Sequence, residues 1–134
     1  MTKTKKNQKI LIVEDEEDLC LILEMILNRN YVTIDHVKKI SAAEDYLKNS
    51  VPDLILLDIR LPDGFGVNFI SFIKGFYAMV KIIMISGKDG AAMDEALHNG
   101  VDLFLSKPFS RYELLSSVDK LLNTQNNFAK EVLA

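Results

Sequence analysis

The stretch DLILLDIRLPDG (residues 53–64) steps abruptly from apolar to charged residues. Four apolar residues lead directly to Asp58, and an Arg, a Pro and a Gly follow it closely. The apolar run has the length and composition of a buried strand. A carboxylate at the end of such a strand costs free energy unless a cation or hydrogen-bond donors compensate for its charge. We therefore expect the surroundings of Asp58 to be a functional site.

The rest of the chain repeats this pattern of an apolar run followed by an amphipathic segment of helix length. The runs span residues 9–14, 31–37, 53–58, 81–86 and 101–106. The first, third and fourth are nearly continuous Val, Ile, Leu and Met, as in strands that helices cover on both faces. The other two alternate, so we expect them near the sheet edges. The pattern predicts one α/β domain with a flavodoxin-like, doubly wound parallel (βα)5 sheet in strand order 2-1-3-4-5.

Local signals predict several helix ends. SAAE (41–44) and SRYE (110–113) match the capping box, in which a Ser accepts from an N–H one turn later and a Glu reaches back. Both are expected to mark helix starts. Gly75 and Gly100 suit the left-handed residue that follows a helix C-terminus.

The first helix is expected from about Glu16 to Asn28 and is unusually apolar. Its expected core stripe consists of Leu19, Ile22, Leu23 and Ile26. Leu21 and Met25 lie off this stripe. They are either lipophilic surface or secondary core residues, which are common, or part of a face that docks a partner.

Composition narrows the class of protein. The chain has 134 residues, 49% of them hydrophobic and 26% charged, which suits one globular domain. We expect a basic N-terminal extension (1–7), the domain (8–122), and a tail or the start of a linker (123–134). The formal charge of -3 argues against direct binding to nucleic acid. The single Cys20 and the lack of a long apolar stretch or signal sequence predict a cytoplasmic protein that is not in a membrane.

Unusual polar residues gather where the predicted strands end. Glu14 and Asp15 end the first strand, Asp58 the third and Ser86 the fourth, and Lys107 follows the fifth. The carboxyl ends of parallel strands meet at one edge of a sheet, so these side chains should share a crevice. Three carboxylates there would repel one another without a cation, and oxygen ligands suit Mg²⁺. The Lys ammonium and the Ser hydroxyl complete a frame for a phosphoryl group.

Each of these residues also has an ordinary structural explanation. A lone Asp at a strand end often caps a turn or helix, and Ser86 before Gly87 could form a local Ser turn. Acids at the start of the first helix are favoured by the helix dipole. These explanations do not account for the gathering of all of them at the same end of different strands.

Four motifs resemble the receiver domain of bacterial two-component response regulators over residues 8–122. ILIVEDEE is similar to that family's acidic pair after the first strand, and LILLDIRLPDGFG to its acceptor strand and following loop. IIMISGK is similar to the family's Ser/Thr strand, and LFLSKPF to its Lys-Pro motif. The resemblance implies a signalling switch that accepts a phosphoryl group and is not otherwise an enzyme.

The resemblance also implies roles for residues of the acceptor and metal sites. Asp58 would take the phosphoryl group from a phosphohistidine of a sensor histidine kinase or a phosphotransfer protein. Mg²⁺ would be held by Glu14, Asp15, Asp58 and the backbone carbonyl of Arg60. Arg60 or Lys88, which flank the crevice, would tune the lifetime of the phosphorylated state; the alternative is that both are solvated surface charges.

The same resemblance assigns the phosphate-binding and switch residues. Lys107, Ser86 and Gly87 would contact the phosphoryl group, and Phe104 would occupy the position of the switch aromatic. The bond between Lys107 and Pro108 is expected to be cis.

Phosphorylation is expected to alter the surface formed by the last two helices and the last strand, and so to control a partner protein or a fused output domain. A phosphorylation-dependent homodimer remains an option, although Ser116 and Ser117 stand where a basic residue would favour one such dimer. Two other functions are less well supported. A nucleotide-binding enzyme would rest on GFGVNF (64–69), which lacks the third Gly of a dinucleotide motif. A receiver-like interaction module that is never phosphorylated would be expected to lack the acceptor, the acidic pair or the Lys.

Overall fold

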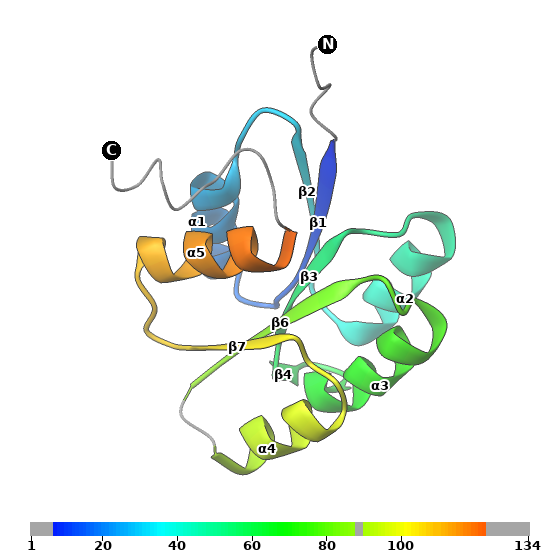
Figure 1. Ribbon diagram of the computed structural model, residues 1–134. Helices are drawn as coiled ribbons and strands as arrows, with labels where there is room; N and C mark the ends of the chain where they lie inside the picture. The colour runs from blue at the N-terminus through cyan, green and yellow to red at the C-terminus, as the bar shows by residue number, and fades with distance from the viewer. Residues whose placement is uncertain (1–6, 88–89, 123–134) are drawn as a thin grey trace.

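The computed structural model describes residues 7–87 and 90–122, and its core is a single parallel sheet of five strands (Figure 1). The strand order is β2-β1-β3-β6-β7, with every neighbouring pair parallel. This is the predicted 2-1-3-4-5 order of the flavodoxin-like fold. The labels β6 and β7 denote its fourth and fifth strands, because two very short strands outside this sheet are labelled β4 and β5. The strands are β1 (Gln8–Val13), β2 (Val32–Val37), β3 (Leu54–Asp58), β6 (Lys81–Ser86) and β7 (Leu103–Ser106).

Five helices cover the two faces of the sheet (Figure 1). Residues of α1 and α5 pack into one hydrophobic cluster, and residues of α2, α3 and α4 into the other. The helices are α1 (Glu17–Leu27), α2 (Ile40–Asn49), α3 (Gly66–Phe76), α4 (Gly90–His98) and α5 (Arg111–Leu122). The doubly wound architecture predicted from the repeating pattern is therefore confirmed.

Burial along the strands follows from this layering. In β3, Leu54 and Leu56 face the cluster of α1 and α5, whereas Ile55 and Leu57 face the other cluster. All four are at most 1% exposed, which explains why this strand lacks a polar alternation. Among the five strands of the parallel sheet, β1, β3 and β6 are mostly buried, whereas β2 and β7 leave most of their side chains partly or fully exposed. Both lie at the sheet edges, as their alternating sequences predict.

A short hairpin follows β3 and was not predicted. It consists of β4 (Arg60–Leu61) and β5 (Gly64–Phe65), which pair antiparallel. Two-residue strands are too short to leave a periodic signal in the sequence. The hairpin matters because it contains Arg60 and leads directly into α3.

Two of the predicted helix signals are correct and two are wrong. Ser110 does cap α5: its hydroxyl accepts from Glu113 N at 3.0 Å, and Glu113 Oε1 accepts from Ser110 N at 3.3 Å. Gly100 has a φ of 98°, as predicted for the residue after α4. Gly75 instead lies inside α3, which continues to Phe76.

The predicted capping box at Ser41 is also wrong. Helix α2 begins at Ile40, with Lys39 rather than Ser41 at the N-cap, and the carboxylate of Asp63 accepts hydrogen bonds from the backbone N–H groups of Ile40 and Ser41. The first backbone N–H groups of α2 are therefore capped by Asp63 of the β4–β5 hairpin, and not by the side chain of Ser41.

The core face of α1 differs from the predicted stripe. Cys20, Leu23 and Leu27 are buried, whereas Ile22 is 50% exposed. Within residues 7–87 and 90–122, no helix has the length and apolar character needed to cross a membrane. The predicted tail (123–134) and most of the N-terminal extension (1–7) lie outside the described residues.

Candidate functional site

Three carboxylates meet at the carboxyl edge of the sheet. Asp58 is the last residue of β3, and Glu14 and Asp15 follow the last residue of β1. The register places Val13 beside Leu57, so the next residues of both strands are brought together. One carboxylate oxygen from each of the three side chains lies within 4.8 Å of the others. This spacing is short enough for one cation to bind all three.

Glu14 is the buried member of this group, at 3% exposure. Its Oε2 accepts a hydrogen bond from Asp15 N at 2.9 Å. Burial, followed by the hydrogen bond and the negative charge of Asp58, raises the pKa of Glu14 to about 8, against a smaller opposing effect of Lys107. The cluster therefore retains a proton at neutral pH when no cation compensates for its charge, as like charges in a low-dielectric site require.

Lys107 supplies a positive charge beside the carboxylates. Its Nζ lies 3.5 Å from Glu14 Oε1 and 3.9 Å from Asp58 Oδ1. The backbone of Lys107 is held at the end of β6, since Lys107 N donates to Ser86 O at 2.6 Å. The bond from Lys107 to Pro108 is cis, as expected. The ammonium group can therefore contact both Asp58 and a group attached to it.

An open crevice of about 420 Å³ lies at this edge of the sheet. Its lining residues are Asp15, Glu16, Asp58, Arg60, Ser86, Gly87 and Lys107. Asp58 is accessible from it, with 13% of its side chain exposed. The sequence reasoning did not single out Glu16, although its place in the acidic run EDEED could have indicated it. Lys88 lies outside the described residues.

Phe104 is not among the residues that line the crevice. It sits in β7 beside Met84 of β6, is partly buried, and packs against the cluster formed with α2, α3 and α4. Ser86, at the end of β6, is 8% exposed and pairs with Ser106. The hydroxyl-bearing residue and the aromatic residue thus lie on adjacent strands, and their role as a switch stays a prediction.

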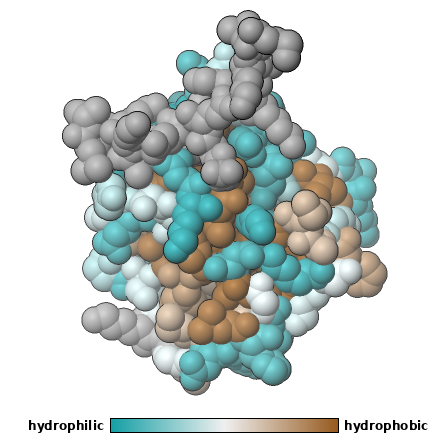
Figure 2. Space-filling model, in the orientation of Figure 1, coloured by the Kyte–Doolittle hydropathy of each residue, from teal (hydrophilic) through white to brown (hydrophobic). Residues whose placement is uncertain are grey.

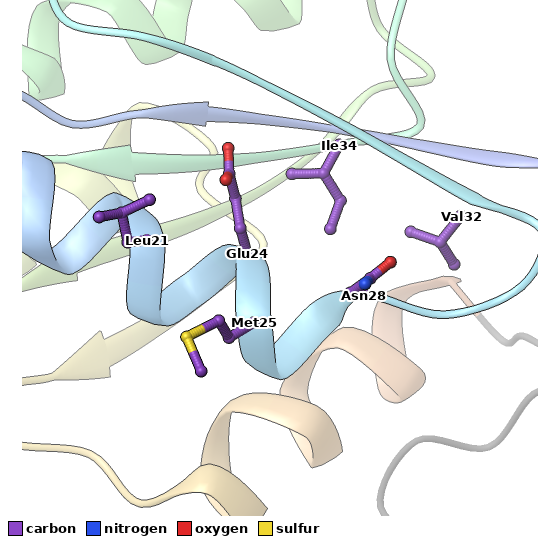
Figure 3. A pocket seen from close by; sticks show the side chains of 6 residues that line it. All are labelled: Leu21, Glu24, Met25, Asn28, Val32 and Ile34. Atoms are coloured by element: carbon purple, nitrogen blue, oxygen red, sulfur yellow. The ribbon is translucent and has the colours of Figure 1, made fainter.

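A second hollow lies between α1 and the edge strand β2 (Figure 3). It measures about 350 Å³ and is lined by Leu21, Glu24, Met25, Asn28, Val32 and Ile34. Leu21 is 53% and Met25 76% exposed, so neither is a core residue. The exposure of Leu21 and Met25 excludes a secondary core role, so they are either lipophilic surface residues or part of a docking face. Glu24 also lies 3.4 Å from Nδ1 of His36.

Comparisons with known proteins agree with the fold and the motifs. Residues 10–119 match the model of the response regulator receiver domain family. The chain is 33% identical over 126 residues to the response regulator protein PilR of Pseudomonas aeruginosa, covering 92% of this chain and 28% of PilR. It is 30% identical over 128 residues to the phosphate regulon transcriptional regulatory protein PhoB of Escherichia coli, covering 92% of this chain and 56% of PhoB. The chain thus spans about half of the length of PhoB and less than a third of the length of PilR.

Solved structures give the same result. The beryllofluoride-activated receiver domain dimer of NtrC4 superimposes with a TM-score of 0.80 at 34% identity, over 86% of this chain and 96% of that one. A two-component response regulator from Clostridium difficile superimposes with a TM-score of 0.81 at 27% identity, over 87% of this chain and 96% of that one. Family match, relatives and fold together show that this chain belongs to the receiver domains of two-component response regulators.

Proposed function

We propose that this chain is a phosphorylation-dependent signalling switch, and that Asp58 accepts a phosphoryl group from a phosphohistidine on a sensor histidine kinase or a phosphotransfer protein. One observation carries the proposal: an accessible carboxylate stands at the end of a buried strand, beside two more carboxylates and the ammonium group of Lys107. A buried strand holds its last residue rigidly, which favours an in-line reaction at a fixed point.

In the proposed reaction, a carboxylate oxygen of Asp58 attacks the phosphorus of the phosphohistidine. An oxygen–phosphorus bond forms while the phosphorus–nitrogen bond breaks. The imidazole nitrogen keeps the electron pair of the broken bond and takes up a proton. The product is an acyl phosphate on Asp58, and no redox change occurs.

The donor set fits Mg²⁺, a cation that prefers oxygen ligands and keeps several waters. Glu14, Asp15 and Asp58 would hold it, together with the backbone carbonyl of Arg60. When bound, it would neutralise negative charge on the carboxylates and on the phosphoryl oxygens. Lys107 would contact the acceptor carboxylate and a phosphoryl oxygen, and the Ser86 hydroxyl with the Gly87 N–H would approach another oxygen.

The proposed output follows from the added charge of about -1.5 to -2 at this edge. Attraction of Ser86 toward the phosphoryl group would shift the end of β6 and leave space into which Phe104 can turn. The surface of α4, β7 and α5 would then change, as in a two-state element that a local charge biases. Arg60 and Lys88 would tune how fast water removes the phosphoryl group.

This output surface already exposes apolar side chains. Met93 and Leu97 of α4 are 39% and 54% exposed, and Tyr112 of α5 is 43% exposed. In the view of Figure 2, hydrophobic residues lie among hydrophilic ones over the middle of the molecule. Such a surface suits a partner protein, a fused output domain or a second copy of the chain. The greater length of PilR and PhoB supports an output domain.

The proposal is tested by incubating the protein with acetyl phosphate and Mg²⁺ and measuring its intact mass. We expect one added phosphoryl group on the wild type, and none on Asp58→Asn or in the presence of EDTA. Asp53→Asn, at the other end of β3, is the matched control and should be phosphorylated like the wild type. A wild-type protein that neither gains mass nor binds Mg²⁺ would instead be an interaction module that is not phosphorylated.

A further inference from the structure

We propose that Asp63 is a positioning residue for the Mg²⁺ site: it ties the hairpin that follows Asp58 to helix α2, and thereby holds the backbone carbonyl of Arg60 in place. This inference rests on the proposed Mg²⁺ site. It concerns a residue that lies outside the crevice and would not itself contact the metal.

The tie consists of two hydrogen bonds between elements that are far apart in the sequence. Asp63 lies in the turn between β4 and β5. Its Oδ1 accepts from Ile40 N at 2.8 Å, and its Oδ2 accepts from Ser41 N at 2.9 Å. These N–H groups belong to the first turn of α2 and lack an acceptor within the helix. Because each oxygen takes a separate donor, the pair of bonds fixes the orientation of the carboxylate as well as its position.

Packing holds the same end of the hairpin against α2. A Cβ built on Gly64 would lie 3.3 Å from Ile40 Cδ1, so the backbone of β5 approaches this helix closely. Leu61 of β4 is 8% exposed and belongs to the same core cluster as Ala43 and Leu47 of α2. The hairpin and α2 therefore form one packed unit, and Asp63 supplies its polar contact.

The other end of the hairpin is attached to the sheet and to α3. Ile59 N donates to Ile85 O at 3.3 Å, and Gly66 N donates to Ile59 O at 2.6 Å. Arg60 pairs with Phe65 between these bonds and the turn that contains Asp63. The direction of the Arg60 carbonyl thus depends on both attachments. Loss of the tie at Asp63 leaves the attachment at the base and the apolar packing against α2, which is less directional than hydrogen bonds.

Calorimetric titration with Mg²⁺ alone tests this role. We expect Asp63→Ala to raise the Kd for Mg²⁺ by about 10-fold, the lower end of the effect of groups that orient metal ligands. Asp63→Asn keeps one carbonyl oxygen as an acceptor, so its Kd should lie between those of Asp63→Ala and the wild type.

Asp53→Ala is the matched control. Asp53 Oδ2 accepts a hydrogen bond from Lys9 N at 2.8 Å, the same kind of contact, at the opposite end of β3 from Asp58. Its loss should lower stability and leave the Kd for Mg²⁺ unchanged. Equal affinities of the wild type and Asp63→Ala, or an equal loss in Asp53→Ala, would overturn the inference. A wild type that does not bind Mg²⁺ would overturn the proposed metal site itself, and this inference with it.

A measurement on the wild type covers the case in which Asp63→Ala does not fold. Coupling between two sites is reciprocal, so Mg²⁺ should also change the contact between Asp63 and α2. We expect the amide NMR resonances of Ile40 and Ser41 to shift on saturation with Mg²⁺, and their hydrogen exchange to slow. Unchanged resonances and exchange at both residues would count against the tie.

Discussion

Among the carboxylates of the site, Glu14 is the buried one, and its pKa is raised. Its carboxyl is buried close to Asp58, and burial followed by the effect of Asp58 raises its pKa from 4.5 to about 8. Between these two values the folded protein binds more protons than the unfolded chain. The contribution of Glu14 to the free energy of unfolding of the metal-free protein should therefore fall as the pH rises from about 4.5 to about 8, because a group stabilises the fold more at higher pH only where the unfolded chain binds more protons.

Glu14→Gln isolates this effect. Because Gln does not titrate, the variant should become more stable relative to the wild type as the pH rises from 5 toward 8. Urea unfolding in EDTA at several pH values measures the difference. Glu44→Gln, on the exposed surface of α2, controls for the Glu-to-Gln change itself. A difference between Glu14→Gln and the wild type that stays constant over this pH range would contradict the burial effect.

At the residue scale, sequence alone could predict that the side chains at the carboxyl ends of the strands lie close together. Glu14, Asp15, Asp58 and Lys107 each come directly at or after a strand, so the topology determines where they meet. Asp63 could not be predicted in the same way. Its hydrogen bonds reach 22 and 23 residues back along the chain, and such long-range caps leave no local spacing.

At the element scale, α3 begins in unusually close contact with β3. A Cβ built on Gly66 would lie 2.2 Å from the backbone oxygen of Asp58 and 3.2 Å from Leu57 Cγ. No side chain fits there without a backbone shift. We expect Gly66→Ala to lower the free energy of unfolding by about 1–3 kcal/mol, as overpacked sites do, and to weaken Mg²⁺ binding by displacing Asp58.

Gly75, in the same helix, provides the opposite case. A Cβ built there meets no atom of the described residues within 4 Å. Gly75→Ala should therefore raise the free energy of unfolding by about 0.5–1 kcal/mol, because Ala loses less conformational entropy in a helix. Denaturant unfolding of both variants measures the contrast. Equal effects of the two substitutions would show that the approach of α3 to Asp58 is looser than described.

The strands and helices were predictable where they are long enough to show a periodic pattern of apolar residues. Strands of four to six residues and helices of nine to twelve left clear patterns, including the edge positions of β2 and β7. The two-residue strands β4 and β5 did not. The prediction that Ser41 caps α2 was wrong because Asp63, which is distant in the sequence, accepts from the first N–H groups of this helix. The prediction that α3 ends before Gly75 was also wrong, since the helix continues to Phe76.

At the scale of the whole molecule, the groove between α1 and β2 lies close to the crevice along the chain. Helix α1 begins two residues after Asp15, and its exposed Leu21, Ile22 and Met25 follow within one to three turns. A donor protein whose phosphohistidine enters the crevice would also meet α1, which begins at that edge of the sheet. We therefore expect the groove to contribute to the docking of the phosphodonor.

Met25→Ser tests this contribution. Met25 is 76% exposed, so the free energy of unfolding should change by no more than about 0.5 kcal/mol. The rate of phosphorylation by acetyl phosphate should be unchanged, whereas the rate with a histidine kinase that phosphorylates the wild type should fall. Equal rates with that kinase would mean that Met25 is only lipophilic surface. Met79→Ser, 88% exposed in the segment after α3, is the matched control.

The central claim is that Asp58 carries the phosphoryl group. Reduction of the phosphorylated protein with borohydride converts an aspartyl phosphate into homoserine, and peptide mass spectrometry locates it in the chain. We predict homoserine at position 58 alone, only after treatment with Mg²⁺ and a phosphodonor. Homoserine at Asp15, Asp53 or any other position, or its absence from a protein that has gained a phosphoryl group, would contradict this account.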